Sequence, residues 1–254
     1  MTTIVIAESN PPGWALQTAT RVGAVMQEIA PGLTVRVVAP YAGPLAADAF
    51  ADADGVVFPG STVEWNTSAP EAGPLRAALV AALDGGRPVF GICNGMQLAA
   101  SALGGRVAAS PNGSEIVVAR AIVPTAAGAA HQMLKGRKPG YSVFCAHRDE
   151  VVDMPTEGVV LAGNAHSPVQ AMAVRAGGVD FWGCQYHVEF DTAIAAEVAE
   201  RTGQPASVVS DLQAAATDAA AAARVGMRVG DLEPEQHRTE IRNWLGYVMA
   251  RARR

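Results

Sequence analysis

A short apolar run passes directly into a helix-like segment in the stretch Arg87-Pro88-Val89-Phe90-Gly91-Ile92-Cys93-Asn94-Gly95-Met96-Gln97. We expect a buried strand over 88–92 and a helix over 94–103, with Cys93 at the junction. Glycines two residues before and after the cysteine suit a tight turn that larger side chains would obstruct. The layout is typical of a nucleophile elbow, in which the helix N-terminus favours a thiolate. A buried structural cysteine fits the same residues, so this motif alone leaves both interpretations open.

Apolar strands alternate with helices on the N-terminal side of this stretch. We expect strands over 3–7, 33–38 and 55–58, and helices over 14–29, 46–53 and 75–83. Because each strand is apolar throughout, the pattern predicts an α/β fold with a mostly parallel central sheet flanked by helices. Ligands of such sheets bind at the carboxyl ends of the strands. The loops expected at that rim are those around Asn10, Tyr41, Gly60 and Cys93.

The pattern changes to short strands after Gly104-Gly105. We expect these strands over 107–109, 115–123, 141–145, 159–162, 169–174 and 181–186. Closely spaced strands separated by turns predict an antiparallel extension of the sheet. Residues 125–140 are rich in glycine and polar side chains, and we expect a loop there with at most one helical turn.

Residues 191–254 are expected to form a C-terminal helical region packed on a main domain of residues 1–190. Asp191 is placed to cap a helix that ends near Arg201. The alanine-dense segment 207–224 predicts one docked helix, and Glu233-Pro234 is expected to open a last helix. Whether these helices cover a site or form a homodimer interface stays open.

Composition limits the classes of partner. The 254 residues carry a formal net charge of −5, which argues against a nucleic-acid partner. Three cysteines without regular spacing argue against a disulfide framework and for a cytoplasmic, reducing location, and they form no metal signature. We expect no membrane segment, because no apolar run approaches the roughly 20 residues that span a bilayer. No phosphate-binding G-x-x-x-x-G-K-[ST] motif is present, so we expect no nucleotide or other cofactor.

A thiolate nucleophile needs a base and a group that orients this base. Among the five histidines, His187 ends an apolar strand near the expected rim, and Glu189 follows two residues later. In an extended chain residues i and i+2 point to the same side, so Glu189 is placed to orient His187. His131 and His166 are expected in loops, and His237 on the surface of the last helix.

Two ordered motifs carry a resemblance to a known family. Gly91-Ile-Cys93-Asn-Gly95-Met-Gln97, followed by Gly183-Cys-Gln-Tyr-His187-Val-Glu189, resembles the class I glutamine amidotransferases. The segments Asp54-Gly-Val-Val-Phe-Pro-Gly60-Ser61 and Cys145-Ala-His-Arg-Asp-Glu-Val151 agree with the same family. The likeness covers about residues 3–190 and is greatest to stand-alone amidotransferase domains similar to that of GMP synthase. It implies a flavodoxin-like sheet and a Cys-His-Glu triad.

The resemblance implies a role for each matching residue. Cys93 is the nucleophile, His187 the acid and base, and Glu189 the group that orients it. The oxyanion would be held by the backbone N–H groups of Gly60 and Asn94. The residues implied in substrate binding are Gln97, Arg148 and Asp149, while His147 in the same segment is expected to be structural. The substrate would be glutamine or another γ-glutamyl compound, cleaved through a glutamyl thioester.

Departures from the family pattern keep the function open. Val188 stands where the family usually has proline, and Asn94 and Met96 replace larger or basic residues, which puts a preference for free glutamine in doubt. One hypothesis is an amidotransferase that supplies ammonia to a separate synthetase chain. A second is a stand-alone γ-glutamyl amide or peptide hydrolase, with Trp14, Tyr41 and Trp65 receiving a larger leaving group. A non-catalytic regulatory member is disfavoured by the intact triad.

Overall fold

One large sheet organises the chain. The structure is a computed structural model, and it describes residues 1–14 and 18–253. Within those residues, nine strands form a sheet in the order β2-β1-β3-β4-β11-β10-β9-β6-β7. The parallel strands are β1 (Thr3–Ala7), β2 (Thr34–Val38), β3 (Gly55–Phe58), β4 (Pro88–Ile92) and β11 (Val179–Cys184). The predicted parallel core is therefore confirmed.

The antiparallel part of the sheet begins at β11. Its further strands are β10 (Ala171–Ala176), β9 (Gly158–Gly163), β6 (Glu115–Pro124) and β7 (Tyr141–His147). A separate ribbon pairs β5 (Arg106–Ala109) with β8 (Asp149–Asp153), a strand that the sequence pattern did not predict. The predicted antiparallel extension is thus present, and it carries the chain back to β11 beside β4.

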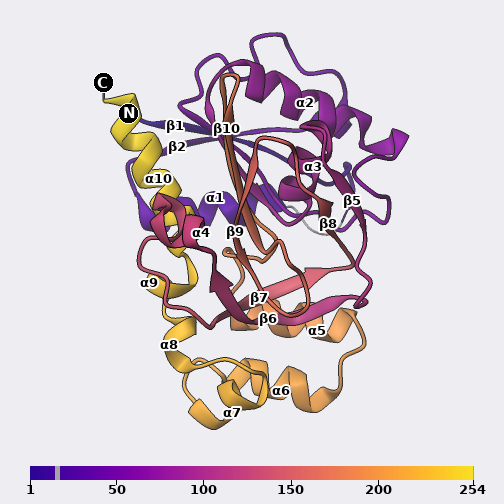
Figure 1. Cartoon of the computed structure of the whole chain (residues 1–254), viewed down its shortest axis with the longest axis vertical. Helices are drawn as coiled ribbons and strands as arrows, with labels where there is room; N and C mark the ends of the chain where they lie inside the picture. The colour runs from indigo at the N-terminus through magenta and orange to yellow at the C-terminus, as the bar shows by residue number, and fades with distance from the viewer. Residues whose placement is uncertain (15–17, 254) are drawn as a thin grey trace.

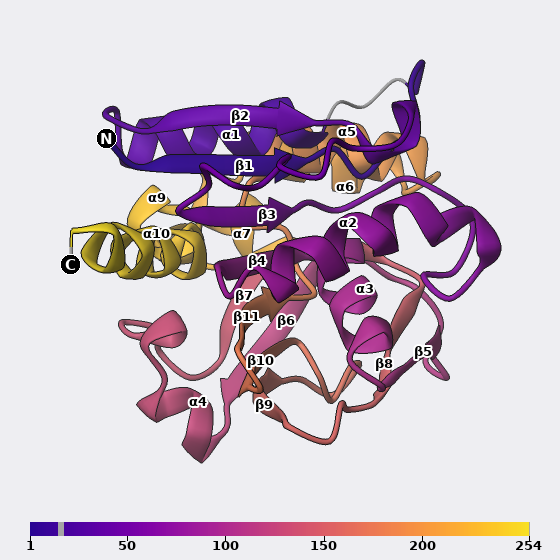
Figure 2. The same ribbon diagram turned by 90° about the horizontal axis from the view of Figure 1, so that it is seen from above.

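Helices cover both faces of the parallel strands (Figure 2). Along β1, Ile4 and Ile6 join one core while Val5 and Ala7 join the other, as alternation across a strand requires. The first core includes α1 (Thr18–Ile29) and α10 (Thr239–Ala252), and the second includes α2 (Gly73–Asp84) and α3 (Asn94–Ala102). The helix expected from Trp14 is described from Thr18, because residues 15–17 lie outside the described residues.

The C-terminal helices form a third core against β6 and β7 (Figure 1). The C-terminal helices are α5 (Thr192–Arg201), α6 (Ala206–Ala214), α7 (Ala219–Arg224), α8 (Val229–Leu232) and α9 (Pro234–His237), followed by α10. The third core takes its helical residues from α5 to α8. Asp191 caps α5 as predicted, by accepting a hydrogen bond from the Ile194 N–H at 2.9 Å. Farther along, Arg137 and Glu240 form a fully buried, bidentate ion pair that ties α10 to the sheet domain.

Three local expectations were wrong. Residues 46–53 form successive turns instead of a helix, because Arg36 and Arg87 donate to the carbonyls of Ala49 and Ala53. The expected helix over 207–224 breaks into α6 and α7, since Asp218 caps a new helix. The last helix is interrupted at Arg238, after α9.

His237 is buried against Phe144, with ring centroids 5.1 Å apart, and does not lie on the surface as expected. Burial and the charge of Arg137 lower the pKa of His237 to about 3, so this ring is neutral in the core. Residues 125–140 contain more helix than predicted, in α4 (Ala126–Ala130) and the 3-10 turn η3 (Gln132–Leu134). Within the described residues, no helix is both long and apolar enough to span a bilayer.

Candidate active site

Cys93 lies at the turn between β4 and α3, in a backbone conformation that residues other than glycine rarely adopt. Its φ is 48° and its ψ is −105°, and its N–H donates to the carbonyl of Cys184 at 2.8 Å. A Cβ on Gly91 would lie 2.7 Å from the Met96 nitrogen, so the turn itself excludes a side chain there. At Gly95 the obstacle is the carbonyl of Phe58 on the neighbouring β3. The elbow geometry thus depends on close packing against the sheet as well as on the turn.

His187 reaches Cys93 because β11 runs parallel to β4. The register pairs Cys184 with Ile92, so the residues that follow both strands emerge at the same rim. His187 is anchored by its own N–H, which donates to the Phe144 carbonyl at 2.8 Å. Its side chain interacts with Cys93, and this interaction contributes to the pKa of the imidazole.

Glu189 lies 2.6 Å from His187, measured from its Oε1 to Nδ1 of the imidazole. The expectation of an extended chain was wrong, because β11 ends at Cys184 and Val188 and Glu189 form a turn. The turn still brings the two side chains together, and valine occupies the buried position between them. The absence of proline at 188 is therefore compatible with the contact.

The electrostatics of His187 favour its protonated form. Burial works to lower the pKa of the imidazole, but the charge of Glu189 and the hydrogen bonds with Cys93 and Glu189 outweigh it. The pKa of His187 is raised to about 10, well above its usual 6.5. At neutral pH the ring therefore holds a proton next to the sulfur of Cys93. A protonated imidazole beside the sulfur is the arrangement that stabilises a thiolate nucleophile when it forms.

Gly60 packs directly against both groups. A Cβ on Gly60 would lie 2.6 Å from Cε1 of His187 and 3.6 Å from Cβ of Cys93, so glycine leaves the room that this approach needs. Asn94 is the first residue of α3, where the backbone N–H has no partner within the helix. Both backbones thus lie close to Cys93. Among the described residues, the side-chain Oδ1 of Asn94 is buried without a hydrogen-bond partner.

A cavity of about 220 Å³ opens on Cys93, and the three expected substrate-binding residues line it. Gln97 donates from Nε2 to the Asp149 carbonyl at 2.6 Å and to Gln185 Oε1 at 3.1 Å, so its amide holds the cavity wall in place. Arg148 is exposed and donates to the Asp149 carboxylate at 2.8 Å. The structure therefore brings Gln97, Arg148 and Asp149 together at Cys93, with their side chains partly bound to one another.

A second cavity of about 460 Å³ opens on His187. It shares Ser61, Thr62, Ala146, His147 and Arg148 with the smaller cavity, so the two adjoin. Sequence reasoning missed the residues of its far wall, among them Phe190, Ile194 and Val198. Of these residues, only Phe190 could have been predicted from the sequence, because it directly follows Glu189. Ile194 and Val198 are recognised as lining residues only from the tertiary structure.

Of the three aromatic rim residues predicted to receive a leaving group, two line these cavities and Tyr41 lines neither. Trp14 lines the larger cavity and Trp65 the smaller. Trp65 makes edge contacts to Trp14 and Tyr41, with centroids 6.0 and 6.1 Å apart. These rings therefore form one packed group at the rim.

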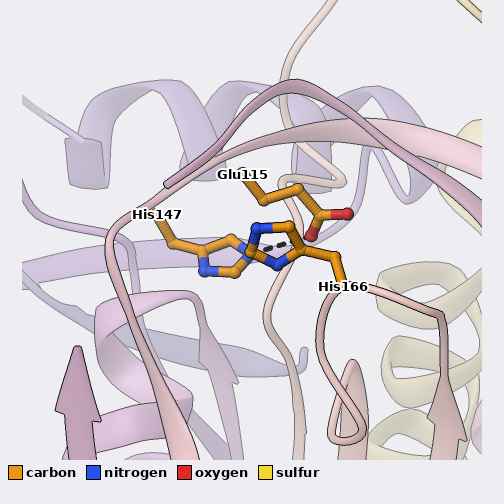
Figure 3. Close-up of side chains that lie close together, drawn as sticks. All are labelled: Glu115, His147 and His166. Carbon is orange, nitrogen blue, oxygen red and sulfur yellow. Dashed lines mark hydrogen bonds and ion pairs between the residues drawn. The ribbon is translucent and has the colours of Figure 1, made fainter. Parts of the chain in front are cut away.

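Glu115, His147 and His166 lie close enough together to be considered as metal ligands (Figure 3). Glu115 Oε2, however, already accepts hydrogen bonds from His147 at 2.9 Å and Gln170 at 2.7 Å, and Oε1 accepts one from Asn164 at 2.7 Å. Burial works to raise the pKa of Glu115, but these hydrogen bonds outweigh it and hold this pKa below its usual value. A cation would have to displace them. We assign the cluster to joining β6, β7 and the loop before β10, in line with the structural role expected for His147.

Comparisons with known proteins agree on one family. The model of the family described as glutamine amidotransferase class-I matches residues 29–197. A γ-glutamyl-L-1-hydroxyisopropylamide hydrolase from a Pseudomonas species is 38% identical over 152 residues, covering 58% of this chain and 50% of that protein. A glutamine-hydrolysing GMP synthase from Aeropyrum pernix is 34% identical over 179 residues, covering 65% of this chain and 32% of that one. The chain thus spans half or less of the length of these relatives.

Solved structures show the same fold at low sequence identity. A putative GMP synthase subunit from Thermoplasma acidophilum superposes with a TM-score of 0.67 at 17% identity, covering 100% of this chain and 96% of that one. A glutamine amidotransferase from Thermotoga maritima gives a TM-score of 0.68 at 15% identity, with 97% of each chain covered.

Proposed function

This chain belongs to the class I glutamine amidotransferase family, and on that premise we propose that it is a cysteine hydrolase that cleaves the γ-amide of glutamine or of a related γ-glutamyl compound. The observation that carries the proposal is the chain of contacts from Cys93 through His187 to Glu189, at the junction of the two cavities. A nucleophile, its base and the group that orients the base are the parts that acyl transfer needs.

The mechanism follows from these positions. The Cys93 thiolate attacks the γ-carbonyl carbon, and the backbone N–H groups of Gly60 and Asn94 stabilise the oxyanion that forms. One such donor contributes about 3 kcal/mol to many acyl-transfer reactions. His187 gives its proton to the departing nitrogen, and Glu189 keeps the imidazole oriented while it does so. Water then loses a proton to His187 and attacks the glutamyl thioester, which releases glutamate and restores Cys93.

Gln97, Arg148 and Asp149 are proposed to shape the pocket for the glutamyl part. All three line the cavity that opens on Cys93. Because the Gln97 amide is bound to the Asp149 carbonyl, we assign Gln97 the role of holding this segment in place as well as contacting substrate.

The fate of the released amine separates two versions of the proposal. The GMP synthase relatives support an amidotransferase whose ammonia passes to a separate synthetase chain. The name of the Pseudomonas relative describes hydrolysis of a γ-glutamyl amide of an organic amine, and this supports a stand-alone hydrolase. The two versions share the chemistry at Cys93.

The arrangement of the chain belongs to the same proposal. We assign residues 1–190 to the amidotransferase domain and residues 191–254 to a helical region packed on it through α5 and α10. We also propose that the protein works in the reducing cytoplasm, and the free thiols of Cys93, Cys145 and Cys184 support this proposal.

The direct test is glutamate release by the purified protein from glutamine and from a γ-glutamyl peptide, with Cys93→Ala as the matched control. We expect release to require Cys93, while circular dichroism and melting of the variant stay close to those of the wild type, since the change removes one sulfur at the rim. Turnover of either substrate by Cys93→Ala at the wild-type rate would refute the nucleophile assignment.

A further inference from the structure

Each of the two cavities at the site is lined by a different catalytic residue. Cys93 lines the smaller cavity, and His187 lines the larger one. Five residues line both cavities, so a single substrate can extend from one into the other. The scissile bond would then lie above the contact between Cys93 and His187.

This division assigns a direction to the substrate. The acyl carbon has to reach the sulfur of Cys93, and the departing nitrogen has to reach His187, which protonates it. The glutamyl part is therefore held on the Cys93 side, and whatever is attached to the nitrogen extends into the cavity on the His187 side.

The larger cavity has the wrong character for ammonia alone. Its volume is about 460 Å³, and an apolar wall is formed by Ile116 of β6, by Phe190, and by Ile194 and Val198 of α5. Such a wall stabilises hydrocarbon and contributes nothing to the binding of a small polar product.

The apolar wall belongs to a helix that packs in the core, so the fold itself holds this side of the cavity in place. Ala195, Ala196 and Ala199 on the opposite side of α5 are buried in the third core, beneath Ile194 and Val198. Asp191 caps the start of the same helix. The C-terminal region therefore supplies a fixed wall of this cavity.

Charged side chains lie at the edge of the same cavity. Arg21 and Arg201 line it together with Arg148 and Glu197. Among the ion pairs of the described residues, none involves Arg21 or Arg201. The Arg21 guanidinium lies over the Phe190 ring, 5.8 Å from its centroid, which brings a cation to the apolar wall.

We propose that this cavity is a subsite for the leaving amine, and that the preferred substrates are γ-glutamyl amides of primary amines with an apolar aliphatic group. The inference rests on the proposed function and names its substrate class. Hydrolysis breaks the C–N bond, forms and then cleaves the Cys93 thioester, and yields glutamate and the free amine with one water consumed. Two sources share this chemistry: a neutral alkylamine, and an apolar α-amino acid whose carboxylate would meet Arg21 or Arg201.

The test compares kcat/KM for glutamine, γ-glutamyl isobutylamide and γ-glutamyl-leucine. We expect both larger substrates to exceed glutamine by about ten-fold or more, because one methylene in a fitted apolar pocket already changes kcat/KM by about that factor. If γ-glutamyl-leucine has the highest kcat/KM and Arg201→Gln lowers it to that of the isobutylamide, the natural leaving group is an apolar amino acid. If only the isobutylamide exceeds glutamine in kcat/KM, the natural leaving group is an alkylamine.

Filling the cavity provides the second arm. Val198→Trp should lower kcat/KM for the isobutylamide by about ten-fold or more and leave glutamine within about two-fold. Ala193→Trp is the matched control, since Ala193 is exposed on the same helix and does not line the cavity. Equal losses on glutamine and the isobutylamide would overturn the subsite, as would a wild-type preference for glutamine.

Binding to Cys93→Ala separates this inference from the proposed function. Calorimetry with glutamine and γ-glutamyl isobutylamide measures the subsite without turnover, and we expect tighter binding of the isobutylamide. Equal affinities overturn the leaving-amine subsite even when glutamine is hydrolysed. Tighter binding of the isobutylamide, with no Cys93-dependent release from any substrate, refutes the catalytic proposal and supports the subsite.

Discussion

The ring of Phe190 lies flat against the imidazole of His187, with centroids 4.0 Å apart and an interplanar angle of 13°. Glu189 holds Nδ1 of the same imidazole from its edge. The stacked ring therefore restrains the face of the His187 imidazole, and the hydrogen bond restrains its edge. Phe190 contributes the first restraint without taking part in proton transfer.

Loss of this stacking should slow catalysis. We expect Phe190→Leu to lower kcat for glutamine by about ten-fold, because small misplacements of catalytic groups are costly, while the melting temperature changes little. Glutamine is the substrate to use, since its ammonia does not need the apolar cavity. Phe190→Tyr keeps the ring and serves as the control; equal kcat for the leucine and tyrosine variants would count against a positioning role.

Gly60 offers a test of how tightly the site is packed. In Gly60→Ala the new methyl would lie 2.6 Å from Cε1 of His187, so the imidazole must move away from Cys93. We expect kcat/KM to fall by about a hundred-fold, as measured by glutamate release. Gly246→Ala on the exposed side of α10 is the matched control, because nothing lies within 4 Å of the new methyl there. A fully active Gly60→Ala enzyme would show that the close approach is unimportant.

The pH profile reports the contact between Glu189 and His187. Glu189 helps to raise the pKa of His187 to about 10, so activity that needs the protonated ring should persist at mildly alkaline pH and fall as pH rises through that pKa. Glu189→Gln removes the negative charge, which lowers this pKa and moves the alkaline limb of kcat/KM to lower pH. It should also reduce kcat more than it raises KM. An unshifted limb would mean that Glu189 does not set the protonation of His187.

The buried pair of Arg137 and Glu240 should dominate the stability of the C-terminal region. Both side chains are almost fully buried, and Tyr186 also donates to Glu240 at 2.7 Å. Glu240→Ala leaves the guanidinium buried without its partner, and we expect a loss of about 3–5 kcal/mol in the free energy of unfolding.

Two further variants test the origin of that loss in denaturant titrations. The double change Arg137→Met with Glu240→Leu removes both charges and should recover most of the stability. Asp211→Asn disrupts the exposed pair with Arg224 and should change little. If Glu240→Ala were as stable as the wild type, α10 would not depend on this pair.

Features that depend on neighbouring residues could be predicted from the sequence alone. Apolar runs such as 3–7 and 88–92 predicted parallel strands, Asp191 predicted a helix start, and the glycines around Cys93 predicted the elbow. These signals are local, since they arise from side-chain alternation, caps and backbone strain within a few residues. The resemblance in two motifs then pointed to Cys93, His187 and Glu189.

Features that depend on contacts between distant segments could be recognised only in the tertiary structure. Arg36 and Arg87 turned the expected helix over 46–53 into successive turns, and packing buried His237. The same kind of contact joined Glu115, His147 and His166, and placed α5 across from His187 to enclose a cavity. No pattern along the chain encodes these proximities, because they arise only when the sheet and helices pack and bring distant side chains together.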